Sequence, residues 1–127
     1  MNTDFNLERI EIYQAIGELA YVVAKSDHDL TLAEKEAFYQ IAKEELEYDS
    51  WAAMDRFDLL DRVTQPTIYL AYFDALEELK KHGAAFTTEL KEKALLVLQR
   101  FAACCEGLNA NEAFVLARFR NDLQSLG

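Results

Sequence analysis

The spacing of apolar residues between positions 7 and 25 limits the fold more than any other feature. One row recurs at steps of three and four, and it consists of Ile12, Ile16, Leu19 and Val23. A second apolar row lies beside it and consists of Ile10, Tyr13, Ala20 and Ala24. Because so wide an apolar arc needs neighbours on several sides, the stretch predicts a largely buried helix within a bundle. Gly17 lies inside this pattern and predicts a close crossing with another helix.

The remaining apolar residues follow the same helical spacing, and polar caps divide them into separate helices. Thr31, with Glu34 three residues later, forms a capping-box pattern in which each side chain bonds the backbone N–H of the other. Further helix starts are predicted at Ser50, at Pro66 as the first helical position, at Thr87 or Thr88, and at Asn109. No stretch keeps a period-two alternation. We therefore predict an all-α fold with about six helices.

The length and the last long apolar stretch indicate one compact unit. At 127 residues the chain most simply forms a single domain over residues 1–127. The segment from Ala94 to Cys105 is apolar almost all round, so we expect it to be the most buried helix.

Acidic charge is concentrated in the first half of the chain. Residues 1–64 hold 15 acidic and 6 basic side chains, so this half contributes −9 of the formal net charge of −10. A nucleic-acid backbone or an anionic membrane surface needs cations from its partner, so the acidic balance argues against both. It leaves cations and proteins with a basic surface as candidate partners, and a second copy of the chain as another.

Cysteine usage and hydropathy predict a cytoplasmic protein. Cys104 and Cys105 are adjacent and form no disulfide framework, which fits a reducing compartment. The first residues, MNTDFNLERIE, lack the basic start and apolar core of a signal peptide. Wholly apolar runs last only a few residues, so no transmembrane segment is predicted, and membrane association would at most be peripheral and through partners.

Two helix junctions of the chain are similar to each other. Residues 24–38 read AKSDHDLTLAEKEAF, and residues 102–116 read AACCEGLNANEAFVL. With a constant offset of 78 positions, Leu30 matches Leu108 and Glu34 matches Glu112. The match extends into the flanking helices and predicts two pseudo-repeated helical hairpins, packed on each other through similar inner faces.

The first junction resembles the signature of the tellurite-resistance TerB-like family, which the N-terminal domain of the DjlA co-chaperone shares. That signature is Ala-x-x-Asp-Gly-x-Leu/Ile-Ser/Thr-x-x-Glu. Asp27, Leu30, Thr31 and Glu34 occupy matching positions, whereas His28 stands where the family has Gly. The resemblance implies an all-helical bacterial cytoplasmic protein linked to tellurite and other stress responses, to assemblies near the inner membrane, and to metal binding through the loop carboxylates.

The residues of this junction also suggest a cation site directly. Asp27, Asp29 and Glu34 offer carboxylate oxygens, the ligands that Ca²⁺ and Mg²⁺ prefer. The alternative is purely structural, because Glu34 also serves the capping box and either aspartate would brace the turn. His28 is expected on the loop surface, as a turn residue or as a partner of the aspartates around a transition metal. His82 is expected at a helix C-terminus, where the helix dipole favours its protonated form.

Three functions remain open at this stage. The leading hypothesis is a non-enzymatic TerB-like domain that acts as a stress-response interaction or scaffold module, with a divalent cation at the loop carboxylates. The second is a metal-dependent enzyme that uses Asp27, Asp29, Glu34 and the acidic residues of the third helix around one cleft. The third is a structural dimerisation domain that uses the aromatic residues Tyr69, Tyr72 and Phe73. No Gly-rich phosphate loop and no nucleophile motif is present.

Overall fold

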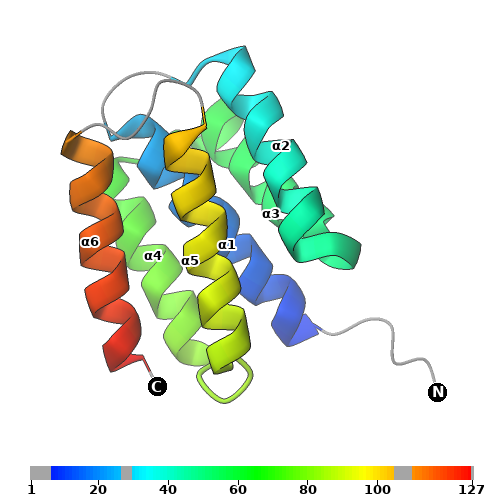
Figure 1. Cartoon of the computed structure of the whole chain (residues 1–127), viewed down its shortest axis with the longest axis vertical. Coiled ribbons are helices and arrows are strands. Elements are labelled where there is room, and N and C mark those ends of the chain that lie inside the picture. The colour runs from blue at the N-terminus through cyan, green and yellow to red at the C-terminus, as the bar shows by residue number, and fades with distance from the viewer. Residues whose placement is uncertain (1–6, 27–29, 105–109, 127) are drawn as a thin grey trace.

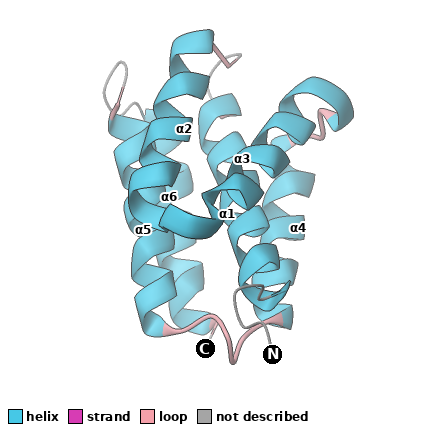
Figure 2. Ribbon diagram, turned by 90° about the vertical axis from the view of Figure 1, so that its right-hand side faces the viewer, coloured by secondary structure: helices cyan, strands magenta, loops and turns pink. Residues whose placement is uncertain are grey.

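The chain folds into a bundle of helices (Figure 1). The computed structural model describes residues 7–26, 30–104 and 110–126. In chain order its elements are α1 (Leu7–Lys25), α2 (Leu32–Leu46), η1 (Glu47–Asp49), α3 (Ser50–Leu59), η2 (Leu60–Thr64), α4 (Ile68–Lys81), α5 (Thr88–Ala103) and α6 (Ala110–Ser125). These ranges contain no strand, as Figure 2 also shows, so the predicted all-α class is confirmed for the described residues.

The second and third predicted helices form one bent segment. α2 passes through the 3₁₀ turn η1 into α3, and α3 passes into the π-helical turn η2, without a coil residue between them. The cap predicted at Ser50 is wrong, because α3 begins with Ser50 itself and Asp49 stands at the cap position without a side-chain cap bond. The Asp49 carboxylate instead accepts a 2.7 Å hydrogen bond from Nε of Arg9 in α1. An ion pair across the bundle thus replaces the local cap.

α1 is the central helix of the bundle. It buries 13 of its 19 residues and contacts α3, α4, α5 and α6. A Cβ built on Gly17 would lie 2.2 Å from the carbonyl oxygen of Ala53 in α3. Since no side chain fits in that space, glycine is what allows the two backbones to approach, and the predicted close crossing is confirmed.

The expectation that Ala94 to Cys105 forms the most buried helix is wrong. α5 buries 5 of its 16 residues, and Leu96 is among the exposed apolar side chains. α5 covers one side of α1 and also contacts α2 and α6, as its place in front of α1 in Figure 1 shows. The apolar residues of α5 therefore did not reveal that α5 covers one side of the bundle, whereas α1 is enclosed on several sides.

Threonine caps start two of the helices as predicted. The backbone N–H of Thr31 donates to Oε1 of Glu34 at 2.9 Å, and the N–H of Glu34 donates to Oγ1 of Thr31 at 3.1 Å. Both bonds of the capping box are therefore present at α2. At α5, Oγ1 of Thr87 accepts a hydrogen bond of 3.3 Å from the N–H of Leu90.

Of two other predicted helix starts, the one at Pro66 is wrong and the one at Asn109 lies outside the described residues. α4 begins after Pro66, because Thr67 occupies the cap position and its hydroxyl accepts from the N–H of Leu70 at 3.2 Å. Pro66 therefore precedes the cap and is not the first helical residue. The cap predicted at Asn109 lies outside the described residues.

A cluster of three aromatic rings joins the bent segment to α5. The rings of Phe38 and Phe57 are stacked with centroids 4.4 Å apart, and Phe101 meets them edge-on at 5.4 and 5.9 Å. Each ring is almost fully buried. Because such pairs add to the free energy gained by burial, this cluster fixes how α2, α3 and α5 lie relative to one another.

The inner faces of the two predicted hairpins are buried, but their repeat stays a prediction. The matched positions that are buried in both hairpins are Leu19 with Val97, Ala20 with Leu98, Val23 with Phe101, Ala24 with Ala102, Phe38 with Leu116, and Ile41 with Phe119. Leu30 packs partly buried against the core, whereas its partner Leu108 lies outside the described residues. Burial of these positions is also what any two amphipathic hairpins would show.

Candidate functional site

The predicted loop site is described only at one of its three residues. Asp27 and Asp29, like His28 between them, lie outside the described residues. Glu34 is buried at the start of α2, where its carboxylate accepts the N–H of Thr31. The capping role of Glu34 is thereby confirmed, and the cation at this loop stays a prediction.

Two acidic residues of the predicted third helix have partners in α2. Asp58 bonds the hydroxyl of Tyr39 in α2, and Asp61 forms an ion pair of 2.6 Å with Lys35. Asp55 is exposed. Asp58 and Asp61 therefore hold α3 and η2 against α2. The cleft of the enzyme hypothesis stays a prediction, because Asp27 and Asp29 lie outside the described residues.

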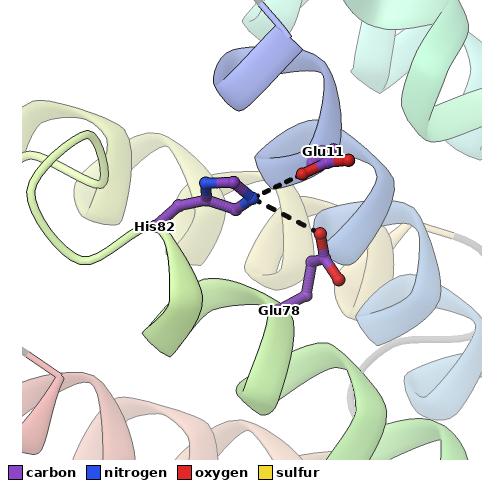
Figure 3. Close-up of side chains that lie close together, drawn as sticks. All are labelled: Glu11, Glu78 and His82. Atoms are coloured by element: carbon purple, nitrogen blue, oxygen red, sulfur yellow. Dashed lines mark hydrogen bonds and ion pairs between the residues drawn. The ribbon is translucent and has the colours of Figure 1, made fainter.

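A different set of carboxylates converges on His82, the residue that follows α4. In Figure 3, Glu11 of α1 and Glu78 of α4 point toward the same nitrogen of the His82 ring. Nε2 of His82 lies 2.6 Å from Oε1 of Glu11 and 3.5 Å from Oε2 of Glu78. On the other side of the ring, Nδ1 lies 3.3 Å from Oε2 of Glu8. One imidazole is therefore shared by three carboxylates from two helices, and we call these four residues the His82 cluster.

His82 is 8% exposed, so its side chain is almost fully enclosed by protein. Burial lowers the pKa of His82, but the hydrogen bonds that its ring donates to Glu8 and Glu11 and the charges of Glu11 and Glu78 outweigh this effect, so the net pKa lies above its ordinary value. The expected place at a helix C-terminus is confirmed. The three carboxylates around it were not predicted.

A polar groove of about 810 Å³ opens beside the His82 cluster. Glu78 belongs to both, since it contacts His82 and also lines the groove. The groove lies between α1, the end of the bent segment and α4, and its other ionisable lining residues are Glu18, Arg56, Asp74, Glu77, Lys80 and Lys81. Glu78 is therefore the residue through which the groove and the cluster meet.

Glu18 is the most enclosed charged side chain of the polar groove. It is 3% exposed, and Nη1 of Arg56 lies 3.2 Å from its Oε1. Burial raises the pKa of Glu18 to about 7, although the nearby guanidinium lowers it, and the charges of Asp74 and Glu78 add to the rise. This carboxyl therefore changes its protonation state near neutral pH.

The π-helical turn η2 forms one wall of the polar groove through Leu60 and Thr64. The turn ends at Gln65, whose φ of 44° and ψ of 55° are left-handed, and whose N–H donates to the carbonyl of Leu60 at 2.8 Å. Beyond it, the hydroxyl of Tyr21 donates to the carbonyl of Pro66 at 3.3 Å. Single π-helical turns are enriched at functional sites. This one changes the direction of the chain beside the polar groove.

A second groove, of about 310 Å³, lies between α4 and α6, and we call it the aromatic groove. Its apolar lining residues are Val22, Ile68, Tyr69, Tyr72, Phe73, Phe114 and Val115. Tyr69 is 73% exposed and Phe114 is 68% exposed. At the floor, buried Tyr72 donates from its hydroxyl to Oδ2 of Asp122 at 2.6 Å. The aromatic residues of α4 that the sequence singled out therefore line a groove.

The acidic run at the end of α2 is partly neutralised within the chain. Nη1 and Nη2 of Arg100 in α5 lie 2.7 Å from carboxylates of Glu45 and Glu44, respectively. These ion pairs, like that of Asp49 with Arg9, join parts of the chain that are far apart in sequence. Part of the charge that suggested a basic partner is therefore used inside the bundle.

The His82 cluster had a weak signal in the sequence. Glu78 and His82 are four residues apart, so on a helix they share one face, and Glu8 and Glu11 have the corresponding spacing of three. Neither pair is informative by itself. Their combination became visible only when α1 and α4 were placed side by side.

Comparisons with known proteins add no family to this geometry. No family model matches the chain, and neither the curated proteins nor the solved structures contain a significant match. Across the described ranges, every helix is too short or too polar to span a lipid bilayer.

Proposed function

We propose that this chain is a non-catalytic, TerB-like interaction module that binds a partner protein through the aromatic groove. The observation that carries the proposal is the cluster of large apolar side chains left in solvent along α4 and α6. Isolated exposed apolar residues are ordinary on protein surfaces, whereas a contiguous patch with a groove is typical of a binding surface. The TerB-like kinship and the stress-response role rest on the resemblance of the first junction.

The chemistry of the partner follows from the exposed surface of α4 beside the aromatic groove, where Asp74 and Glu77 line the neighbouring polar groove. Arg118, which lines the aromatic groove itself, is paired with Asp122 at 3.6 Å. Tyr69, Leu70 and Phe73 form the exposed apolar part of α4, and Asp74 and Glu77 follow on the same helix as exposed carboxylates. An amphipathic helix of the partner would place a large apolar side chain in the groove and lysine or arginine beside the carboxylates. This is the helix-in-groove mode of recognition, with charge complementarity selecting the partner. It specifies the basic partner that the acidic composition predicts.

A pair of designed helical peptides tests this function. One carries leucine on one face and lysine on the other, and the second carries glutamate in place of lysine. We expect the lysine peptide to bind and to shift the amide NMR signals around Phe73 and Phe114, and the glutamate peptide to bind more weakly. Phe73→Asp or Phe114→Asp should weaken binding at least about tenfold, since central aromatic residues dominate such interfaces.

Tyr48→Asp is the matched control, because Tyr48 is an exposed aromatic residue in η1, outside the groove. The proposal is wrong if the lysine peptide does not bind, or if all three variants bind it equally. Concentration-dependent sedimentation of the free protein that is lost in Phe73→Asp would instead identify a second copy of the chain as the occupant.

The cation predicted at Asp27, Asp29 and Glu34 remains a separate part of this proposal. Oxygen ligands alone favour Ca²⁺ or Mg²⁺ there. A calorimetric titration with each ion, repeated on the Asp27→Asn/Asp29→Asn double variant, tests it independently of the groove.

A further inference from the structure

We propose that the His82 cluster is a binding site for a divalent transition-metal ion of the Zn²⁺ class. Glu11 and Glu78 would each provide one carboxylate oxygen, and His82 would provide Nε2. The site lies between α1 and α4 and shares no residue with the aromatic groove or with the predicted cation site at Asp27, Asp29 and Glu34. It therefore does not depend on the proposed interaction with a partner protein.

The donor set selects the class of metal. An imidazole nitrogen suits Zn²⁺ and its neighbours, whereas Ca²⁺ and Mg²⁺ take oxygen ligands almost exclusively. Two carboxylates and one histidine give three protein ligands, which is the number found at zinc sites with an open fourth position. Of the three residues, Glu78 alone lines the polar groove, so a water or another ligand at that position would enter past Glu78.

The distances require little rearrangement. The three candidate ligand atoms all lie within 4.8 Å of one another. Tetrahedral bonds of about 2.0–2.2 Å separate ligand atoms by about 3.3 Å. The 3.5 Å between Nε2 of His82 and Oε2 of Glu78 is close to that value. The 2.6 Å contact of Nε2 with Oε1 of Glu11 would have to widen, which rotation of the Glu11 side chain can provide because it is about a quarter exposed.

A second feature is the contact of Glu8 with the other nitrogen of the His82 ring. Metal-binding histidines commonly bond a carboxylate through the nitrogen that faces away from the metal, which fixes the tautomer and the orientation of the ring. Glu8 occupies this place, with Oε2 3.3 Å from Nδ1. This contact leaves Nε2 directed at Glu11 and Glu78, as Figure 3 shows.

The charge of the cluster points in the same direction. Three carboxylates surround the ring, and among the described residues no lysine or arginine forms an ion pair with Glu8, Glu11 or Glu78. Elsewhere in the chain carboxylates do have such partners, as Arg56 for Glu18 and Arg100 for Glu44 show. A divalent cation would neutralise this excess of negative charge more completely than a protonated imidazole.

The test uses the full chain, stripped of metal and titrated with ZnCl₂ by calorimetry, with Co²⁺ as a spectroscopic substitute. We expect one Zn²⁺ to bind and one Co²⁺ to give a visible absorption spectrum. The nitrogen NMR signal of His82 Nε2 should shift on Zn²⁺ binding by more than that of Nδ1. Glu78→Gln and His82→Gln should each weaken Zn²⁺ binding at least about tenfold, and Glu8→Gln should weaken it about tenfold through the ring.

Two controls separate this site from other carboxylates. Glu77 is adjacent to Glu78 and lines the same groove but lies outside the cluster, so Glu77→Gln should change the affinity less than about twofold. The Asp27→Asn/Asp29→Asn variant should bind Zn²⁺ as the wild type does. Far-ultraviolet circular dichroism checks that each variant is folded.

Three results would overturn the proposal. They are the absence of Zn²⁺ binding to the wild type, equal losses in Glu77→Gln and Glu78→Gln, and loss of binding only in the Asp27→Asn/Asp29→Asn variant. The peptide experiment on the aromatic groove is unaffected by any of them, so the two proposals fail separately.

Discussion

α1 meets α3 and α4 through two contacts that are built in different ways. At Gly17 the backbone of α1 lies directly against the backbone of α3, with no space for a single added carbon. Along α4, the same helix presents Glu11 to His82, and Glu18 lies in a groove of about 810 Å³. The contact at Gly17 is backbone against backbone, whereas the second contact carries ionisable side chains, and Arg56 of α3 reaches one of them, Glu18. One helix can thus hold the fold together on one side and present chemical groups on another.

The largest effect on stability is expected for Gly17→Ala, at the contact of α1 with α3. The added Cβ meets the Ala53 backbone, which cannot move without shifting α3, so we expect a loss of about 3 kcal/mol in the free energy of unfolding. Chemical denaturation measures it. Gly83→Ala is the matched control, because a Cβ there lies 3.4 Å from the nearest atom beyond its chain neighbours, the carbonyl oxygen of Lys80. Equal stability of the two variants would show that the α1–α3 crossing is not closely packed in solution.

The next largest effect is a pH dependence that comes from Glu18 in the polar groove. The pKa of Glu18 is raised to about 7 in the folded chain, so its contribution to stability is fully present below the ordinary carboxyl range and is lost as the pH rises through about 7. Relative to Glu18→Gln, the wild type should therefore lose about 2 to 3 kcal/mol of unfolding free energy between pH 4.5 and pH 8. Denaturant titrations of both proteins across this range measure the difference. A difference that is constant with pH would contradict the raised pKa.

The smallest effect is expected on the wall of the polar groove. Leu59 lines the groove and is 44% exposed, so Leu59→Ser should change the free energy of unfolding by no more than about 0.5 kcal/mol. Thermal and chemical denaturation measure it beside Gly17→Ala. A loss as large as that of Gly17→Ala would mean that the groove is closed in solution, and the contrast between the two sides of α1 would disappear.

The sequence predicted features that depend on a few neighbouring residues. The capping box of Thr31 and Glu34 is local, and Gly17 indicated a close crossing because it interrupts an otherwise apolar helix. Prediction was wrong where a distant residue competes, as at Ser50, where Arg9 holds the Asp49 carboxylate and the helix starts without a side-chain cap. It was also wrong about α5, because its apolar surface did not reveal how many helices would enclose it.

The candidate sites divide in the same way. The aromatic residues of α4 were recognisable because three of them lie within five positions, and one helix turn brings them to a common surface. The His82 cluster was not predicted, because it joins residues 71 positions apart and exists only through the placement of α1 beside α4. Asp27 and Asp29 remain predicted from the sequence alone.

α4 has a role in both proposals, since Phe73 lies in its exposed stripe and Glu78 with His82 marks its last turn. A metal ion held by Glu11 and His82 would act as a pin between this helix and the central one. With its C-terminal end held in this way, α4 would move less relative to α1. The α4 residues of the aromatic groove would then keep a fixed position. Binding of a partner would therefore cost less conformational entropy than binding to a helix that moves.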